Sequence, residues 1–185
     1  MEEMPPVIHR LLALTLALVA SAAVAQTPSA PYAGQQHRPI KALSAEEMRD
    51  LAEGRGMGLA KAAELNGYPG PLHVLELASE LGLTAAQRAT TEALFQRMQA
   101  DARRLGEAIL AAEQELDRRF AHGHINPTTL TTATQSVATL QGQLRAVHLA
   151  AHLEQTALLT PAQIAEYRKQ RGYGSTSGHG GHRHP

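Results

Sequence analysis

The sequence predicts an all-α protein built around a long antiparallel helical hairpin with shorter flanking helices. Its 185 residues include 33 Ala and 25 Leu but only 6 Val and 5 Ile, so strong helix formers far outnumber β-branched residues. Apolar residues also recur at helical spacing, and most of the predicted helices follow a Ser, Thr or Asn that can cap them. This length is typical of one domain with tails.

Residues 1–25 have the features of a secretory signal peptide. Arg10 precedes an apolar run at positions 11–20, and the sequence AVA at 23–25 fits the small-x-small cleavage pattern. The run is short for a comfortable membrane span, although an uncleaved anchor is the alternative. We therefore expect a mature protein that starts near Gln26 and lies in a bacterial periplasm.

Two further segments are predicted to be disordered. Residues 26–42 are rich in Pro, Gln and Ser and show no periodic pattern, which is typical of a flexible arm. Residues 173–185 form a tail of Gly, Ser and His that cannot build a core. The helical domain is expected to span residues 43–172.

The first predicted helix begins at a capping box, since Ser44 and Glu47 can each bond the backbone of the other. It is expected to extend to Leu65, where Asn-Gly and two prolines follow. Three glycines between positions 54 and 58 weaken its middle by about 1 kcal/mol each relative to Ala. They indicate either close packing against another helix or deliberate mobility.

Two long helices are predicted over residues 84–122 and 126–158. In the first, apolar residues at 94, 98, 105, 109, 116 and 120 are spaced alternately by four and seven, and in the second apolar residues recur every seven positions from Leu130. At 1.5 Å per residue the hairpin is about 50 Å long. The shorter helices cannot cover both of its faces, so we expect an antiparallel homodimer.

Two short helices complete the prediction, one from Pro71 to the breaker Gly82 and one from Thr160 to Arg171. The second long helix and this last helix follow Asn126 and Thr160, both good caps, and each has Pro at its first position.

Two boxes of the form LTxxQ stand 76 positions apart, at 83–87 and 159–163. With the signal peptide and the long hairpin, this pair resembles the Spy/CpxP family of periplasmic proteins, which includes metal-sensor and zinc-resistance relatives. The resemblance implies a curved, cradle-like homodimer with either ATP-independent chaperone activity or metal binding linked to envelope stress. We interpret the six motif residues as structural caps without a catalytic role: Leu83, Thr84, Gln87, Leu159, Thr160 and Gln163.

The composition excludes several other functions. Without Cys the chain has no disulfide framework, thiol catalysis or thiolate zinc site. With 3% aromatic residues and equal numbers of basic and acidic residues, 17 each, nucleic acid is not an expected partner. There is no HExxH and no Gly-rich phosphate loop between a strand and a helix, so we expect no enzymatic activity and no required cofactor.

The preferred hypothesis is a chaperone of the envelope stress response that binds unfolded or misfolded envelope proteins. Apolar side chains and guanidinium groups on the first long helix would contact such clients. The alternative for the arginines is a solvated face paired with neighbouring acidic residues. The candidate client-binding residues are Arg97, Met98, Arg103, Arg104 and Leu105.

The alternative hypothesis is a heavy-metal sensor or resistance protein. His148 and His152 lie one helical turn apart, a spacing that suits one Zn, Cu or Ni ion, although two structural histidines would show the same pattern. His73 and Glu76 form a weaker pair of this kind. The tail histidines are expected to bind divalent metals with little selectivity: His179, His182 and His184.

Overall fold

The computed structural model describes residues 30–173, and every regular element in this part of the chain is helical. The all-α prediction is therefore confirmed for these residues. All the helices belong to the unit that begins at Gln35, and residues 30–34 form a turn in the other unit. The expected signal peptide, residues 26–29 of the expected arm and the tail from residue 174 lie outside the described residues.

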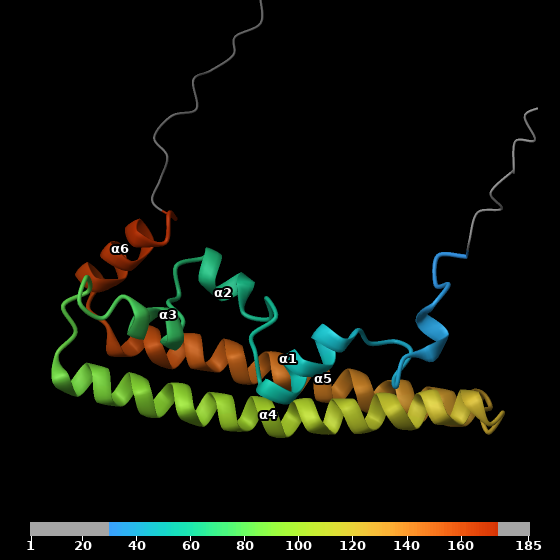
Figure 1. Ribbon diagram of the computed structural model, residues 1–185. Helices are drawn as coiled ribbons and strands as arrows, with labels where there is room; N and C mark the ends of the chain where they lie inside the picture. The colour runs from blue at the N-terminus through green and yellow to red at the C-terminus, as the bar shows by residue number, and fades with distance from the viewer. Residues whose placement is uncertain (1–29, 174–185) are drawn as a thin grey trace, which may run out of the picture. The chain divides into compact units, whose positions relative to one another are not determined.

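Two long helices dominate the unit, α4 at Ala85–Ala121 and α5 at Pro127–Leu158. They run antiparallel and pack along their length (Figure 1). Thr84 and Asn126 cap them as predicted, because each side chain accepts a hydrogen bond from the backbone N–H three residues on. Within residues 30–173, no helix combines the length and the hydropathy needed to cross a bilayer.

The shorter helices lie along one side of this hairpin (Figure 1). Helix α1 packs on α4, α2 on α5, and α3 on both long helices. The bounds of the short elements are η1 at Gln35–His37, α1 at Ala45–Glu53, α2 at Lys61–Leu65, α3 at Pro71–Glu76 and α6 at Pro161–Gln170.

Two separate apolar clusters hold these elements together. The first joins α1 to the middle of the hairpin through Leu51, Ala102, Leu105, Ile109 and Leu144. The second joins α3, the segment after it and α6 through Val74, Leu81, Leu159 and Tyr167. The predicted seam is therefore buried in its middle, whereas Phe120 and Leu130, beside the turn of the hairpin, stay exposed.

The prediction of one helix from Ser44 to Leu65 is wrong. Helix α1 ends at Glu53, because Gly54 adopts a left-handed φ of 66°. A Cβ at Gly54 would lie 2.9 Å from the backbone nitrogen of Arg103, so close packing explains this glycine. The chain then turns through residues 55–60 before α2 begins.

Residues 35–42, part of the predicted flexible arm, differ from that expectation in having fixed contacts. Gln35–His37 form the single turn η1, and Ile40 is buried. The ammonium of Lys41 lies 2.9 Å from the carboxylate of Asp117 on α4. One buried apolar side chain and one ion pair therefore tether a segment whose composition alone suggests a linker.

Helix α1 lies directly against the backbone of α4 at Gly106. A Cβ built on this glycine would lie 1.9 Å from the backbone oxygen of Leu51, so only glycine permits the contact. The sequence gives no obvious sign of this role, since a lone glycine in a long helix looks like a tolerated weakness.

We predict that Gly106→Ala lowers the free energy of unfolding by about 1–3 kcal/mol, because α1 must move away from α4. Gly142 on α5 is the matched control, since a Cβ there meets nothing within 4 Å. Gly142→Ala should stabilise the protein by about 0.5–1 kcal/mol through helix propensity. Urea unfolding followed by circular dichroism measures both, and equal shifts would contradict the close approach.

Candidate functional site

The two LTxxQ boxes meet in space through their glutamines. The amide nitrogen of Gln87 donates to the side-chain oxygen of Gln163 at 2.9 Å, and the reverse bond measures 3.1 Å. Two primary amides thus form a reciprocal pair between the start of α4 and the start of α6. The sequence predicts both boxes as caps but not their contact.

Each glutamine also uses its remaining hydrogen-bonding capacity. The side-chain oxygen of Gln87 accepts from the backbone N–H of Thr84, and that of Gln163 accepts from Thr160, which completes both capping boxes. Their amide nitrogens donate to the carbonyls of Leu158 and Leu81. The motif requires Gln because the position needs an acceptor and two donors on one side chain.

We predict that Gln87→Glu destabilises the fold by about 1–3 kcal/mol. Glutamate keeps the acceptor for Thr84 but loses both donated bonds and brings a charge next to Gln163. Gln143→Glu on the exposed face of α5 is the control, expected to change stability by less than about 0.5 kcal/mol. Thermal unfolding of the two variants measures the difference. Similar losses of stability in both would show that the amide pair contributes little to the free energy of unfolding.

A second cluster surrounds the buried carboxylate of Glu64 on α2, which is only 8% exposed. The phenol of Tyr167 on α6 donates to Oε1 at 2.7 Å, and Nε of Arg171 donates to the same oxygen at 3.3 Å. Burial first, and then the carboxylate itself, raise the pKa of Tyr167, so its hydroxyl stays a donor. The other oxygen, Oε2, is buried and has no hydrogen-bond partner.

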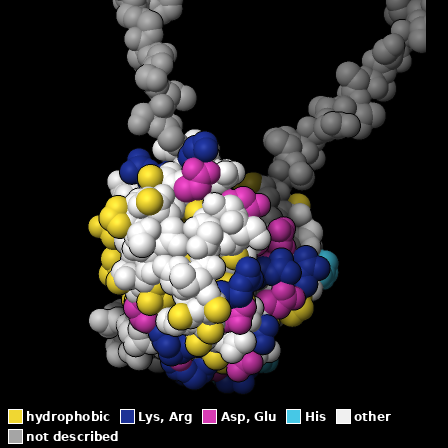
Figure 2. Space-filling model, turned by 90° about the vertical axis from the view of Figure 1, so that its left-hand side faces the viewer, with side chains coloured by type: hydrophobic (Ala, Val, Ile, Leu, Met, Phe, Trp, Pro, Cys, Tyr) yellow, Lys and Arg dark blue, Asp and Glu magenta, His cyan; other side chains and the backbone are white. Residues whose placement is uncertain are grey.

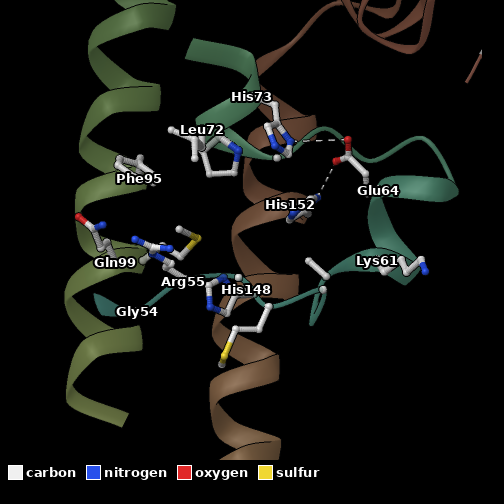
Figure 3. A pocket seen from close by; sticks show the side chains of 17 residues that line it. Gly54, Arg55, Lys61, Glu64, Leu72, His73, Phe95, Gln99, His148 and His152 are labelled. Atoms are coloured by element: carbon white, nitrogen blue, oxygen red, sulfur yellow. Dashed lines mark ion pairs between the residues drawn. The ribbon is translucent and has the colours of Figure 1, made fainter. Parts of the chain in front are cut away.

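Two histidines flank this carboxylate (Figure 3). Nδ1 of His73 lies 3.7 Å from Oε1 of Glu64, and Nδ1 of His152 lies 3.8 Å from Oε2. His152 Nδ1 is also 2.7 Å from the carbonyl oxygen of Tyr68. Because a carbonyl can only accept, this nitrogen carries a hydrogen and donates it to Tyr68.

His148 lies one turn earlier on α5 and is 4% exposed. Its Nε2 is buried without a partner. Burial first, and then the nearby His152, lower the pKa of His148, so the ring is neutral at neutral pH. Figure 3 shows this ring projecting from α5 toward the space between the two long helices.

The structure therefore buries both members of the predicted histidine pair and turns one of them toward Tyr68. Within residues 30–173, no group of three or more His, Cys, Asp or Glu side chains is arranged to hold a metal ion. His73, which the sequence groups with Glu76, lies beside Glu64. The candidate ligands His179, His182 and His184 lie outside the described residues.

Glu64 and the three histidines line a pocket of about 590 Å³ between the hairpin, α3 and the segment that joins α1 to α2. Its volume is in the range of small-molecule sites. Apolar side chains supply much of the wall, and the polar groups come from α2, α3 and α5. Its principal apolar residues are Met57, Leu72, Phe95 and Met98, and its buried polar residues are Glu64, His148 and His152.

The candidate client-binding arginines all have partners within the chain. Arg104 shows the pairing with a neighbouring acidic residue that the sequence left open as an alternative, whereas Arg97 pairs across the hairpin and Arg103 bonds a backbone oxygen. The contacts are Arg97 with Glu154 at 2.5 Å, Arg103 with the backbone oxygen of Glu53 at 3.2 Å and Arg104 with Asp101 at 3.3 Å.

The two apolar candidates lie in different places. Met98 lines the pocket, whereas Leu105 is 3% exposed and belongs to the first apolar cluster. A client could contact Leu105 only if α1 moved away.

Sequence reasoning missed Glu64 and Tyr167. Tyr167 lies one turn after Ile164, and an aromatic residue on an apolar helical face predicts a buried phenol that needs a partner. Glu64 has no such signal, because its partner lies 103 positions away and its own helix is only five residues long.

No protein-family model matches the chain, and neither a curated protein nor a solved structure matches it. The resemblance to the Spy/CpxP family therefore depends on the two motifs and their context.

The buried imidazole of His148 predicts a pH dependence of stability. Because the folded-state pKa is lowered from 6.5, the unfolded chain binds more protons once the pH falls below about 6.5. The titration of His148 therefore leaves the free energy of unfolding unchanged above about pH 6.5. Below that pH it lowers the free energy of unfolding, by at most about 1.4 kcal/mol per pH unit, until the folded-state pKa is reached.

Urea unfolding of the wild type and of His148→Gln between about pH 7.5 and 5.5 tests this sign. The wild type should lose more stability than the variant as the pH falls. Parallel curves would contradict a neutral, buried His148.

Proposed function

We propose that the protein is an exported, ATP-independent chaperone that binds unfolded or misfolded envelope proteins in the periplasm. The paired LTxxQ boxes and their resemblance to the Spy/CpxP family support this function. The supporting structural observation is a set of exposed apolar side chains on α2, α3, α5 and the segment between α2 and α3, all of which contribute residues to the pocket. A cradle-like homodimer is part of the same proposal.

We call four exposed apolar residues the apolar rim. Leu72 lines the pocket, and the carbonyl of Tyr68 bonds His152, the residue before Leu153 on α5. Figure 2 shows hydrophobic side chains gathered on one flank of the end where α4 begins. The rim residues are Leu65, Tyr68, Leu72 and Leu153, which are 54%, 40%, 44% and 59% exposed.

Such a surface suits weak and repeated binding of apolar segments. Grouped exposed apolar side chains are more typical of interaction sites than scattered ones, and each square ångström they bury contributes about 25 cal/mol. Binding of this kind needs no nucleotide. The arginines would then act mainly through the paired surface that they share with acidic residues, with little free charge for client capture.

We predict that mature protein 26–185 suppresses aggregation of an unfolding client without ATP, and that Leu72→Gln with Leu153→Gln reduces suppression several-fold. Phe120→Gln with Leu130→Gln is the control, because it removes similar exposed apolar surface beside the turn of the hairpin. Light scattering measures the effect. Equal losses in both double variants, or no suppression by the wild type, would contradict a client site at the rim.

A metal sensor or resistance protein is the second candidate, favoured by the buried and unpartnered nitrogen of His148. The aggregation assay is repeated with Zn²⁺ or Cu²⁺. If the protein suppresses aggregation only when metal is present, it is a chaperone that metal switches on. Removing residues 175–185 separates the sources of binding: metal binding that survives belongs to the helices, and binding that is lost belongs to the tail. Tight binding that survives, without any suppression of aggregation, would favour the sensor.

A further inference from the structure

We propose that the pocket binds a small organic amine, with its ammonium group at Glu64 and its apolar body against Leu72, Phe95 and Met98. This inference does not depend on the proposed chaperone activity, because it concerns a small molecule and is measured without a client.

The anchor is the free oxygen of Glu64. Oε1 already accepts hydrogen bonds from Tyr167 and Arg171, whereas Oε2 is buried and accepts none, with Nδ1 of His152 3.8 Å away; the residue as a whole is 8% exposed. A buried carboxylate oxygen without a donor is unfavourable, and a charged N–H donor is its strongest partner. An ammonium group at Oε2 would satisfy it without displacing either existing bond.

The neighbouring histidines favour a donor over an anion. Nδ1 of His152 donates to the carbonyl of Tyr68, so Nε2 is a second acceptor whenever the ring holds a single proton. His148 makes no hydrogen bond to the described protein, so its ring offers one acceptor and one N–H, and its Nε2 is buried. A hydroxyl or amide at the far end of the ligand would fit that ring.

The cationic side chains near the pocket do not make it an anion site. Arg55 bonds Glu53 at 2.6 Å and Asp50 at 3.4 Å, and Arg171 is held by Glu64. Lys61 also lines the pocket, but its side chain points away from His148 and His152 in Figure 3. An anionic ligand would instead lie beside the carboxylate of Glu64.

The walls determine the remaining chemistry. Leu72 and Phe95 project toward the space opposite Glu64 (Figure 3), and Met98 adds a thioether to the same apolar wall. About 590 Å³ accommodates an aromatic ring on a short alkyl chain with room for a second polar group. The ligand class is therefore an arylalkyl or branched alkyl amine.

Three ligands of one shape and different head groups test the proposal: 2-phenylethylamine, 2-phenylethanol and 3-phenylpropionate. Calorimetry with the full mature protein at about pH 8, with EDTA present, should find the amine about tenfold tighter than the alcohol and the acid weakest. Equal binding of all three, preference for the acid, or no binding of the amine would overturn the proposal.

Two variants locate the binding site. Glu64→Gln should weaken the amine about tenfold and leave the alcohol unchanged. Because Glu64 also holds Tyr167 and Arg171, Leu72→Arg provides a test that leaves those bonds intact. It places a cation and bulk at the exposed edge of the pocket and should abolish amine binding, whereas Leu130→Arg, on the hairpin outside the pocket, should not.

Two further outcomes would overturn the proposal. One is an equal loss of amine binding in Leu72→Arg and Leu130→Arg. The other is measured without EDTA. If the wild type binds Zn²⁺ but no amine, and Glu64→Gln abolishes the Zn²⁺ binding, the pocket is a metal site.

Discussion

The reciprocal amide pair of Gln87 and Gln163 is the interaction on which the pocket depends. It fixes the start of α6 against the start of α4, 76 positions away in the chain. Helix α6 in turn carries Tyr167, whose hydroxyl holds Glu64 on α2. The short helix α2 has five residues and no side-chain cap, so it depends on tertiary contacts. A requirement for Gln at these two positions follows from the geometry alone, because Glu lacks the donor and Asn lacks the reach. The motif is therefore a joint between helices as well as a pair of helix starts.

The pocket exists because two apolar clusters form on either side of a segment that has few side chains to fill the space. Gly106 brings α1 onto α4, and Gly54 then ends α1 beside Arg103. Three glycines in residues 54–58 contribute backbone without bulk between the first cluster and the second. A Cβ at Gly70 would lie 2.9 Å from the ring of His152, so this glycine also lets an imidazole lie against the loop. Glycine positions thus decide where the helices touch and where they leave a hollow.

Local information accounts for what the sequence could predict. Both long helices, their caps and the final helix follow from spacing and from residues at most four positions apart, and the structure reproduces them closely. The prediction of a continuous helix from Ser44 to Leu65 was wrong because the glycine-rich stretch favours the helix only weakly. The close packing of Gly54 against α4 therefore determines its backbone conformation and ends α1 there. The amide pair, the contact of Glu64 with Tyr167 and the role of Gly106 all join segments distant in the chain. No local pattern distinguishes that Glu or that Gly from an ordinary helical residue.

The buried polar groups without partners fall into two kinds, and the difference bears on function. Thr91 and Gln155 are fully buried on α4 and α5 and do not line this pocket, so a molecule bound in it would leave their unpaired atoms unchanged. Oε2 of Glu64 and Nε2 of His148 also lack a hydrogen-bond partner, but both residues line a pocket of ligand size. An apolar residue at either position would avoid the desolvation cost of about 1–3 kcal/mol. Departures from local consistency of this kind are expected at functional sites. The two groups stand on different elements and face one hollow, which a bound molecule with a donor could satisfy and a random packing defect would not explain.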